Sequence, residues 1–337
     1  MKRSVRRLLT VVGVAALAST AVVGAASAPA PAAAETFGYT IQVRFPAGVG
    51  VQCRPATVDL TTGTVTPIGD WQPAVTLACA SDLALSPSGA LYGITDPESL
   101  ILDAGDVDPA APVLPVHLVQ FDTTTGDVTD LGAIGPNDST LTGRLGNGGI
   151  TFDATGRLLV EMVGLEPACD DLDAMCLYQV DPTDPANATL IGGASSSNYL
   201  FGLTATCSGA LYAVEDTFFD KGADAAEDVR NPGGGNQLDT VNGATGATAA
   251  VGGLTTEGEL IQSLDFTSTG TLVGLGGLLP NGLTTIAHLY AIDPATGTAT
   301  QGVALDATDE FTFVMGLAIA PLSCAAAPVD IQPNFTG

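Results

Sequence analysis

The chain has 337 residues and a formal net charge of −26, and it contains 41 glycines and 21 prolines but only 5% aromatic residues. This composition is typical of many short strands joined by turns, so long helices are not expected. Binding the phosphates of a nucleic acid requires clustered Lys and Arg. Ten Lys and Arg against 36 Asp and Glu therefore exclude nucleic acid as a partner.

Residues 1–34 are predicted to be a signal peptide. Four Lys and Arg lie within the first seven residues, an uncharged run extends from Leu8 to about Ala28, and residues 32–34 are alanines. Cleavage before Glu35 removes four positive residues and no acid, which changes the net charge from −26 to −30. The alternative is an uncleaved membrane anchor, since the run is about long enough to span a bilayer. With cleavage, the chain is expected to be secreted or held in the cell envelope, without membrane contact.

Residues 35–337 are predicted to form one domain with a short C-terminal tail, because two short units recur along them. The first unit is an apolar strand, a Gly turn and a second strand, at 83–89, 150–156, 203–209 and 264–270, with Ser at the last position of 317–323. The second unit is a strand that ends in Asp or Asn, followed by Thr-Gly, at Asp59, Asp122, Asn242 and Asp293. A copy at Asp181 lacks the Gly.

The spacing of the first unit predicts the fold. Successive turn positions lie 67, 53, 61 and 53 residues apart, which leaves room for four short strands and their loops. Strands at 37–43, 56–60 and 64–68 complete one unit with a C-terminal strand at 314–320. The predicted fold class is therefore all-β, a five-bladed β-propeller closed by pairing of the N- and C-terminal strands. An open solenoid or a two-sheet sandwich is the alternative, and it leaves exposed sheet edges.

The motifs Gly-(Ile/Leu)-x-Phe-x-x-x-Gly-x-Leu-Tyr and Leu-Tyr-x-(Ile/Val)-Asp-Pro-x-Thr-Gly resemble the quinoprotein-like or YVTN-type β-propeller repeats over nearly all of the mature chain. The resemblance implies the fold alone, because such repeats occur in unrelated enzymes, adhesins and secreted proteins. No motif supports a quinone site. Such a site is expected to stack aromatic side chains on its ligand, and a chain with a single tryptophan, Trp71, does not suit that arrangement.

Six cysteines in an exported chain predict three disulfides. In a propeller, Cys53, Cys79, Cys169 and Cys176 are expected at one face, and Cys207 and Cys324 at the other. The predicted pairs are therefore Cys53–Cys79, Cys169–Cys176 and Cys207–Cys324. No paired Cys-x-x-Cys spacing indicates a structural metal site.

Carboxylates concentrate in three connections that are expected to lie on one face. The candidate calcium ligands are Asp103, Asp106, Asp108, Asp170, Asp171, Asp173, Glu215 and Asp216. Calcium takes six to eight oxygen ligands, so converging carboxylates suit it, although no EF-hand loop is present. The alternative is that these carboxylates are simply solvated in loops, where a very acidic chain must place them.

Other polar residues have structural explanations. The repeated Asp59, Asp122, Asp181 and Asp293 are predicted to be turn residues that bond to backbone amides. His117 and His288 each begin the third strand of a unit and are interpreted as structural residues at equivalent positions of the repeat. The sequence has no Gly-x-Ser-x-Gly motif that would indicate a hydrolytic serine.

No catalytic residue or certain cofactor is predicted, calcium being the one candidate. The first hypothesis is a secreted or cell-surface, non-catalytic propeller that binds an extracellular protein, a polymer or a cation through its acidic loop face. The second is a calcium-assisted hydrolase or lactonase at the channel mouth. The third is a structural matrix protein without a discrete ligand.

Overall fold

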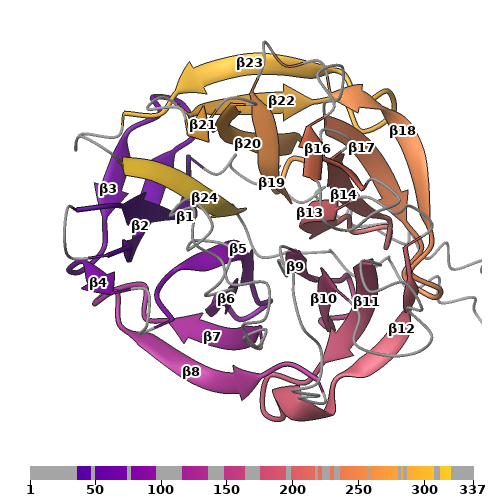
Figure 1. Ribbon diagram of the computed structural model, residues 1–337, viewed down its shortest axis with the longest axis horizontal. Coiled ribbons are helices and arrows are strands. Elements are labelled where there is room, and N and C mark those ends of the chain that lie inside the picture. Colours follow the sequence, from indigo (N-terminus) through magenta and orange to yellow (C-terminus); the bar gives the residue numbers. More distant parts are fainter. Residues whose placement is uncertain are drawn as a thin grey trace, which may run out of the picture. The chain divides into compact units, whose positions relative to one another are not determined.

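The structure is a computed structural model that describes residues 36–46, 50–73, 77–95, 116–135, 148–163, 175–194, 199–216, 219–221, 228–230, 236–254, 256, 259–279, 282–283, 287–306 and 312–319. All of them belong to the compact unit Ala33–Gly337. Five antiparallel sheets follow one another around a ring (Figure 1), which confirms the predicted five-bladed β-propeller. No helix in the described part of the chain is long and apolar enough to cross a membrane.

Each blade contains four strands, ordered below from the centre of the ring outward. The first blade consists of β24 (Thr312–Ala318), β1 (Phe37–Arg44), β2 (Gln52–Asp59) and β3 (Val65–Pro67), with β4 (Gln72–Pro73) also paired to β2. The second consists of β5 (Ala80–Leu85), β6 (Leu91–Thr95), β7 (His117–Phe121) and β8 (Val128–Ala133). The third consists of β9 (Gly149–Phe152), β10 (Leu158–Val163), β11 (Met175–Val180) and β12 (Thr189–Gly193).

The fourth blade consists of β13 (Tyr199–Ala205), β14 (Leu211–Asp216), β17 (Asn236–Val241) and β18 (Thr248–Leu254). The fifth consists of β19 (Leu260–Phe266), β20 (Leu272–Leu279), β22 (His288–Ile292) and β23 (Ala299–Ala304), with β21 (Gly282–Leu283) paired to β20. A separate hairpin joins β15 (Phe219–Lys221) and β16 (Asp228–Arg230).

The two ends of the described chain close the ring. Strand β24 pairs antiparallel with β1, from Tyr39 opposite Ala318 to Arg44 opposite Thr312. Strand β24 also packs against both neighbouring innermost strands, β5 and β19. The predicted closure by N- and C-terminal strands is confirmed, because β24 completes the first blade and lies between the innermost strands of its two neighbours.

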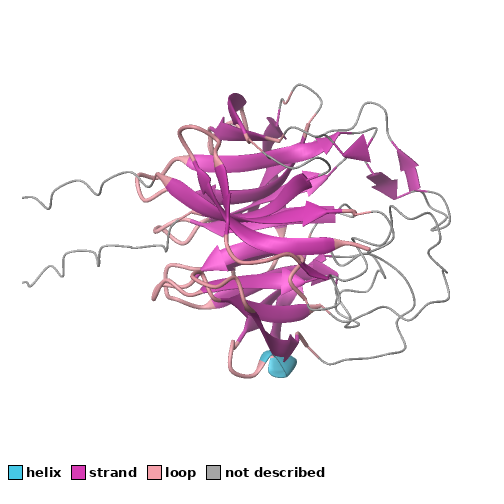
Figure 2. Ribbon diagram, turned by 90° about the vertical axis from the view of Figure 1, so that its left-hand side faces the viewer, coloured by secondary structure: helices cyan, strands magenta, loops and turns pink. Residues whose placement is uncertain are grey.

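Short turns and longer connections lie at opposite ends of the strands. In the first turn, Asp59 Oδ1 accepts the backbone N–H groups of Thr61 (2.8 Å) and Thr62 (2.9 Å), and Gly63 has a φ of +75°. This confirms Asp59 as a turn residue, since a positive φ costs glycine no Cβ clash. We call this end the turn face (Figure 2), and the opposite end, where the innermost strands begin, the loop face.

In the copy that lacks Gly, the turn face is built differently. Asp181 Oδ1 accepts the backbone N–H of Thr183 at 2.9 Å, as in the other turns. A short 3₁₀ helix, η4 (Pro185–Asn187), then leads the chain into β12. Proline at the start of this helix needs no N–H partner, so the longer connection turns without a residue at positive φ.

The apolar core lies between blades, because side chains alternate across each strand. On β10, Leu158 and Val160 pack in a cluster with Ile94 of the second blade. Leu159 between them packs instead with Leu211 of the fourth blade. Alternate residues along a strand therefore pack against different neighbouring blades.

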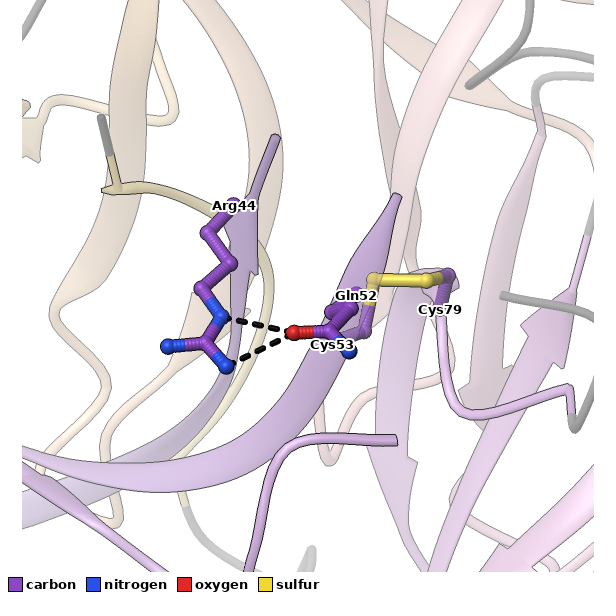
Figure 3. The surroundings of a disulfide bond; sticks show 4 residues. All are labelled: Arg44, Gln52, Cys53 and Cys79. Atoms are coloured by element: carbon purple, nitrogen blue, oxygen red, sulfur yellow. Dashed lines mark hydrogen bonds between the residues drawn. A yellow bond between two sulfur atoms is a disulfide. The ribbon is translucent and has the colours of Figure 1, made fainter. Parts of the chain in front are cut away.

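The Cys53–Cys79 disulfide is confirmed and joins β2 of the first blade to the start of β5 in the second, with the Cα atoms 5.1 Å apart (Figure 3). Cys176 and Cys207 are also disulfide-bonded. Their predicted partners, Cys169 and Cys324, lie outside the described residues, so those two pairings stay predictions.

Two aspartates at the ring's centre connect all five innermost strands. Asp82 on β5 accepts Ser263 Oγ of β19 at 2.5 Å and the Ile150 N–H of β9 at 3.0 Å. Asp265 on β19 accepts Thr204 Oγ1 of β13 at 3.0 Å, and the N–H of Ile319, just after β24, at 2.6 Å. A cavity of about 10 Å³ lies between β5, β9, β13 and β19, the room of roughly one water molecule. The hydrogen bonds of these two aspartates therefore hold the five blades together at the centre of the ring.

We expect Asp82→Ala to lower the free energy of unfolding at pH 7 by about 2 kcal/mol, because it leaves the Ile150 N–H and Ser263 hydroxyl without an acceptor. Asp82→Asn should cost much less, because burial raises the pKa of Asp82 to about 8 and an amide resembles the protonated carboxyl. Urea titration of the two variants at pH 7 checks this. Equal losses in both variants would contradict a protonated Asp82.

Candidate functional site

Six of the predicted calcium ligands lie outside the described residues: Asp103, Asp106, Asp108, Asp170, Asp171 and Asp173. The remaining two, Glu215 and Asp216, end β14 at the loop face, and both are buried. Neighbouring side chains on a strand point to opposite faces. Glu215 lies on the same face as Ala213, which packs toward the third blade. Asp216 lies on the same face as Val214, which packs toward the fifth blade. These two carboxylates thus enter different interfaces.

The interface between the third and fourth blades ends in three carboxyl groups, which we call the carboxyl cluster: Glu161 on β10, Glu215 on β14 and Asp239 on β17. Each lies two residues along its strand from an apolar residue of the same core and points to the same side of the sheet. These apolar residues are Leu159, Ala213 and Val241, respectively. All three are buried, and Glu161 is 0% exposed. Gln237 Nε2 donates to both Glu215 Oε2 and Asp239 Oδ1, each at 2.8 Å.

Glu161 differs from the other two because neither of its carboxyl oxygens has a hydrogen-bond partner. Burial, and next the charge of Asp239, raise the pKa of Glu161 to about 8. The pKa of Asp239 is raised to about 6, chiefly by burial. The hydrogen bond from Gln237 lowers this pKa, and the nearby charge of Glu215 raises it further. Buried like charges disfavour ionisation, so near pH 7 Glu161 keeps its proton unless a cation replaces it.

A second polar group, which we call the histidine site, lies in the fifth blade, also toward the loop face. Glu259, just before β19, contacts His288 Nδ1 through Oε1 at 2.6 Å, and its Oε2 accepts the Tyr290 hydroxyl at 3.0 Å. His288 begins β22, and Tyr290 is buried two residues later on the same strand face. The side chain of His288 is 21% exposed and that of Glu259 is 9% exposed. A nearly buried carboxylate therefore orients a partly accessible imidazole.

Two arginines of the first blade pack against one tryptophan ring. The guanidinium carbons of Arg44 and Arg54 lie 4.2 and 4.0 Å from the centre of the Trp71 ring, within cation–π range. Gln52 Oε1 accepts two hydrogen bonds from Arg44 beside the disulfide (Figure 3). The only tryptophan of the chain thus packs against two of its few arginines.

The sequence reasoning missed Glu161, Asp239 and Glu259. Glu161 lies inside the apolar strand β10 and Asp239 inside the mostly polar strand β17, and each side chain points into an interblade core. An acid within the run Leu-Leu-Val-Glu-Met at 158–162 is the signal that indicates such a buried carboxyl, since unpaired acids are rarely buried. Glu259 has no comparable pattern, because only the fold brings it to His288. In the described part of the chain, no three His, Cys, Asp or Glu side chains are arranged ready to hold a metal ion.

No family model and no curated protein sequence matches the chain. Solved structures do resemble it. TolB from Acinetobacter baumannii is 14% identical with a TM-score of 0.41, and the match covers 84% of this chain and 66% of that one. The gluconolactonase XC5397 from Xanthomonas campestris is 11% identical with a TM-score of 0.41, covering 78% and 76%.

The periplasmic gluconolactonase PpgL from Pseudomonas aeruginosa is 13% identical with a TM-score of 0.39, covering 79% of this chain and 82% of that one. The likeness is one of fold. These structures assign this chain to no group of propellers, so the resemblance to the quinoprotein-like or YVTN-type repeats stays a prediction. The chemistry of this chain is therefore argued from its own residues.

Proposed function

We propose that this protein is an exported β-propeller that binds a divalent cation at the loop-face end of the interface between its third and fourth blades. The observation that carries the proposal is Glu161, a fully buried carboxyl group without a hydrogen-bond partner that lies beside Asp239. A buried carboxyl is stabilised either by a proton or by a cation. Oxygen-rich sites of this kind suit Ca²⁺, Mg²⁺ or Mn²⁺.

Binding would draw the three carboxyl groups of the cluster together around the ion. Glu161 has no hydrogen bond to lose in this movement. Gln237 now donates its amide nitrogen to both Glu215 and Asp239, and rotation of the amide by half a turn presents its oxygen to the ion instead. The ion would replace the proton that Glu161 otherwise retains at pH 7, so binding should release a proton to solvent.

Export is supported by the predicted signal peptide and by the disulfides. The Cys53–Cys79 bridge and the bonded state of Cys176 and Cys207 suit an oxidising compartment outside the cytoplasm. A mature charge of −30 suits a surface that attracts cations.

We expect 5 mM Ca²⁺, Mg²⁺ or Mn²⁺ to raise the melting temperature above its value in EDTA at pH 7. A concentration about 100-fold above the dissociation constant contributes about 2.7 kcal/mol, or roughly 4 °C for a chain of this size. The shift should be absent in Glu161→Gln and Asp239→Asn. It should persist in Asp82→Asn, a matched control that removes a buried carboxyl of raised pKa from the channel.

Calorimetric titration in two buffers of different ionisation enthalpy should also show proton release on binding. If none of the three ions shifts the melting temperature of the native protein, the cation proposal is wrong. A shift that survives in the double variant Glu161→Gln/Asp239→Asn would place the ion elsewhere and would equally overturn the site.

A further inference from the structure

Two bonded cysteines have partners that elimination narrows to two. Cys176 and Cys207 are both disulfide-bonded. Among the described residues, the bridge between the first and second blades is the one disulfide whose two cysteines are both described. The chain has six cysteines, so Cys176 and Cys207 pair with the remaining two, Cys169 and Cys324, in one order or the other.

The place of Cys176 on its strand favours Cys169 as its partner. Cys176 is the second residue of β11, which begins at the loop face, and β10 ends at Val163 on the same face. In the sequence, Cys169 lies between these two ends, seven positions before Cys176. Cys324 follows β24, which ends at the turn face. Cys207 is then left with Cys324.

Cys207 lies in an exposed turn at the turn face. This turn joins β13, the innermost strand of the fourth blade, to β14, and the Gly209 N–H donates to the Thr206 carbonyl at 2.9 Å within it. The same turn in the second and fifth blades has Pro87 and Ser268 in place of the cysteine. The turn itself therefore does not require a cysteine, which points to a role outside it.

The last described residue of the chain lies close to this turn. The Ile319 N–H, just after β24, donates to Asp265 Oδ2 of β19 at 2.6 Å. Asp265 Oδ1 accepts Thr204 Oγ1 of β13 at 3.0 Å, so Ile319 N and Thr204 Oγ1 lie within about 8 Å of each other. Five extended residues span about 17 Å, and a disulfide joins Cα atoms up to about 7 Å apart. Cys324, five residues after Ile319, can therefore reach a cysteine three residues after Thr204.

Strand β24 closes the ring, and its pairing is less regular than that of its neighbour. Strand β1 pairs with β2 over eight consecutive residues, whereas its pairing with β24 shifts register between Tyr39 and Ile41. The extra residue lies on β24, where Gly316 has a φ of +67°. Because β24 is also the last described strand, a bond after it holds the end from which it could peel away from β1.

We propose that a Cys207–Cys324 disulfide anchors the end of β24 to the fourth blade and acts as a redox-controlled lock on ring closure. This inference goes beyond cation binding and uses no residue of the carboxyl cluster. It rests on the predicted export, because the cytoplasm keeps thiols reduced and the lock forms only in an oxidising compartment.

The chemistry of the lock is thiol–disulfide exchange with an oxidant that itself carries a disulfide. One cysteine thiolate attacks the oxidant to form a mixed disulfide, and the second thiolate then displaces the oxidant's remaining sulfur. The two cysteines lose two protons and two electrons and form one S–S bond. The oxidant's disulfide is reduced to two thiols.

In the reduced protein, hydrogen bonds and packing alone hold β24. Phe313 and Met315 of this strand are buried in the core that the first and second blades share, so peeling exposes apolar side chains as well as the edge of β1. The reduced ring can therefore open at β24, and the oxidised ring is held closed at both ends of that strand.

Peptide mapping of the mature protein without reduction tests the bond itself. We expect one fragment that joins Cys207 to Cys324 and another that joins Cys169 to Cys176. A fragment that joins Cys207 to Cys169, or a Cys207 thiol that an alkylating reagent modifies before reduction, overturns the proposal.

Hydrogen exchange tests the lock. In Cys207→Ser/Cys324→Ser, the amides of β24 that pair with β1 should exchange faster than in the oxidised native protein, by at least about 10-fold more than the amides of β10 do. Serine at the equivalent position 268 shows that the turn accepts this residue. The matched control, Cys169→Ala/Cys176→Ala, opens a loop of seven residues within one blade and should leave the exchange of β24 relative to β10 unchanged.

The redox dependence is measured on the native protein. Reduction should give the fast exchange of β24, and oxidised glutathione should restore the slow exchange, which the Cys207→Ser/Cys324→Ser variant cannot regain. Equal acceleration in β24 and β10, or exchange in β24 that does not depend on the redox state, overturns the lock. Glu161→Gln, which tests cation binding, should leave the exchange of β24 unchanged, so the two proposals fail independently.

Discussion

The free energy of unfolding is expected to increase by on the order of 5 kcal/mol as the pH is lowered from 9 to 5. Three buried carboxyl groups cause this dependence. Burial is the largest influence on each, and it raises the pKa of Asp82 and Glu161 to about 8 and that of Asp239 to about 6. Their ordinary values are 3.8 for Asp and 4.5 for Glu.

The direction follows from proton uptake on folding. Each group binds its proton more tightly in the folded chain, so its contribution to stability is complete below the unfolded pKa near 4. That contribution is lost as the pH rises through the folded pKa, first for Asp239 and then for Asp82 and Glu161. Turn aspartates such as Asp59 act oppositely, because backbone N–H donors lower the pKa of Asp59, but only below about pH 4.

Urea titrations at pH 5, 7 and 9 in EDTA measure this effect without a bound cation. Glu161→Gln should flatten the curve and stabilise the protein at pH 9, because the amide cannot ionise in the interblade core. Asp127→Asn, which removes an exposed carboxyl, serves as the control and should keep the native slope. Equal stability of the native protein at pH 5 and 9 would show that the three carboxyls are not protonated in the fold.

Removing the Cys53–Cys79 bridge is expected to cost about 3 kcal/mol, or roughly 5 °C in melting temperature. The bridge spans 26 residues, and a cross-link over a loop of this length restricts the unfolded chain by about that free energy. It also fastens the first blade, in which the ring is closed, to the second. The variant to measure is Cys53→Ala/Cys79→Ala.

A packing control separates the cross-link from the lost side chains. Val43 belongs to the same buried cluster as the two cysteines, and Val43→Ala removes apolar contacts without changing the cross-links. The double variant should show a larger urea m-value, because its unfolded chain exposes more surface, whereas Val43→Ala should keep the native m-value. An unchanged m-value and a loss no larger than that of Val43→Ala would contradict the assigned role of the bridge.

Much of the fold was predictable because its signals are local. Asp59 and Gly63 lie four residues apart, and the turn that they form depends on backbone geometry alone. The five blades were predicted from the other repeated turn, at 89, 156, 209 and 270 with Ser at 323, because its spacing leaves room for four strands in each unit. The expected face of Cys53 and Cys79 followed from their places next to strands, and their pair is confirmed. The exact strand bounds did not follow, since β2 begins at Gln52 instead of 56.

The candidate sites depend on tertiary structure, because their members come from separate strands or blades. Glu161 and Asp239 lie 78 residues apart in sequence, and they meet only because strand parity directs both into one interface. Glu259 and His288 lie 29 residues apart, and Gly276 of the intervening strand allows their contact.

The sequence by itself determined the repeat, the turns and the acidic charge of this protein, since each depends on residues near one another in the chain. Only the packing of blades decided which acids are buried away from solvent, as Asp82 and Glu161 are, and which histidine contacts a buried glutamate. Desolvation is a property of the surroundings, and strands far apart in sequence supply those surroundings.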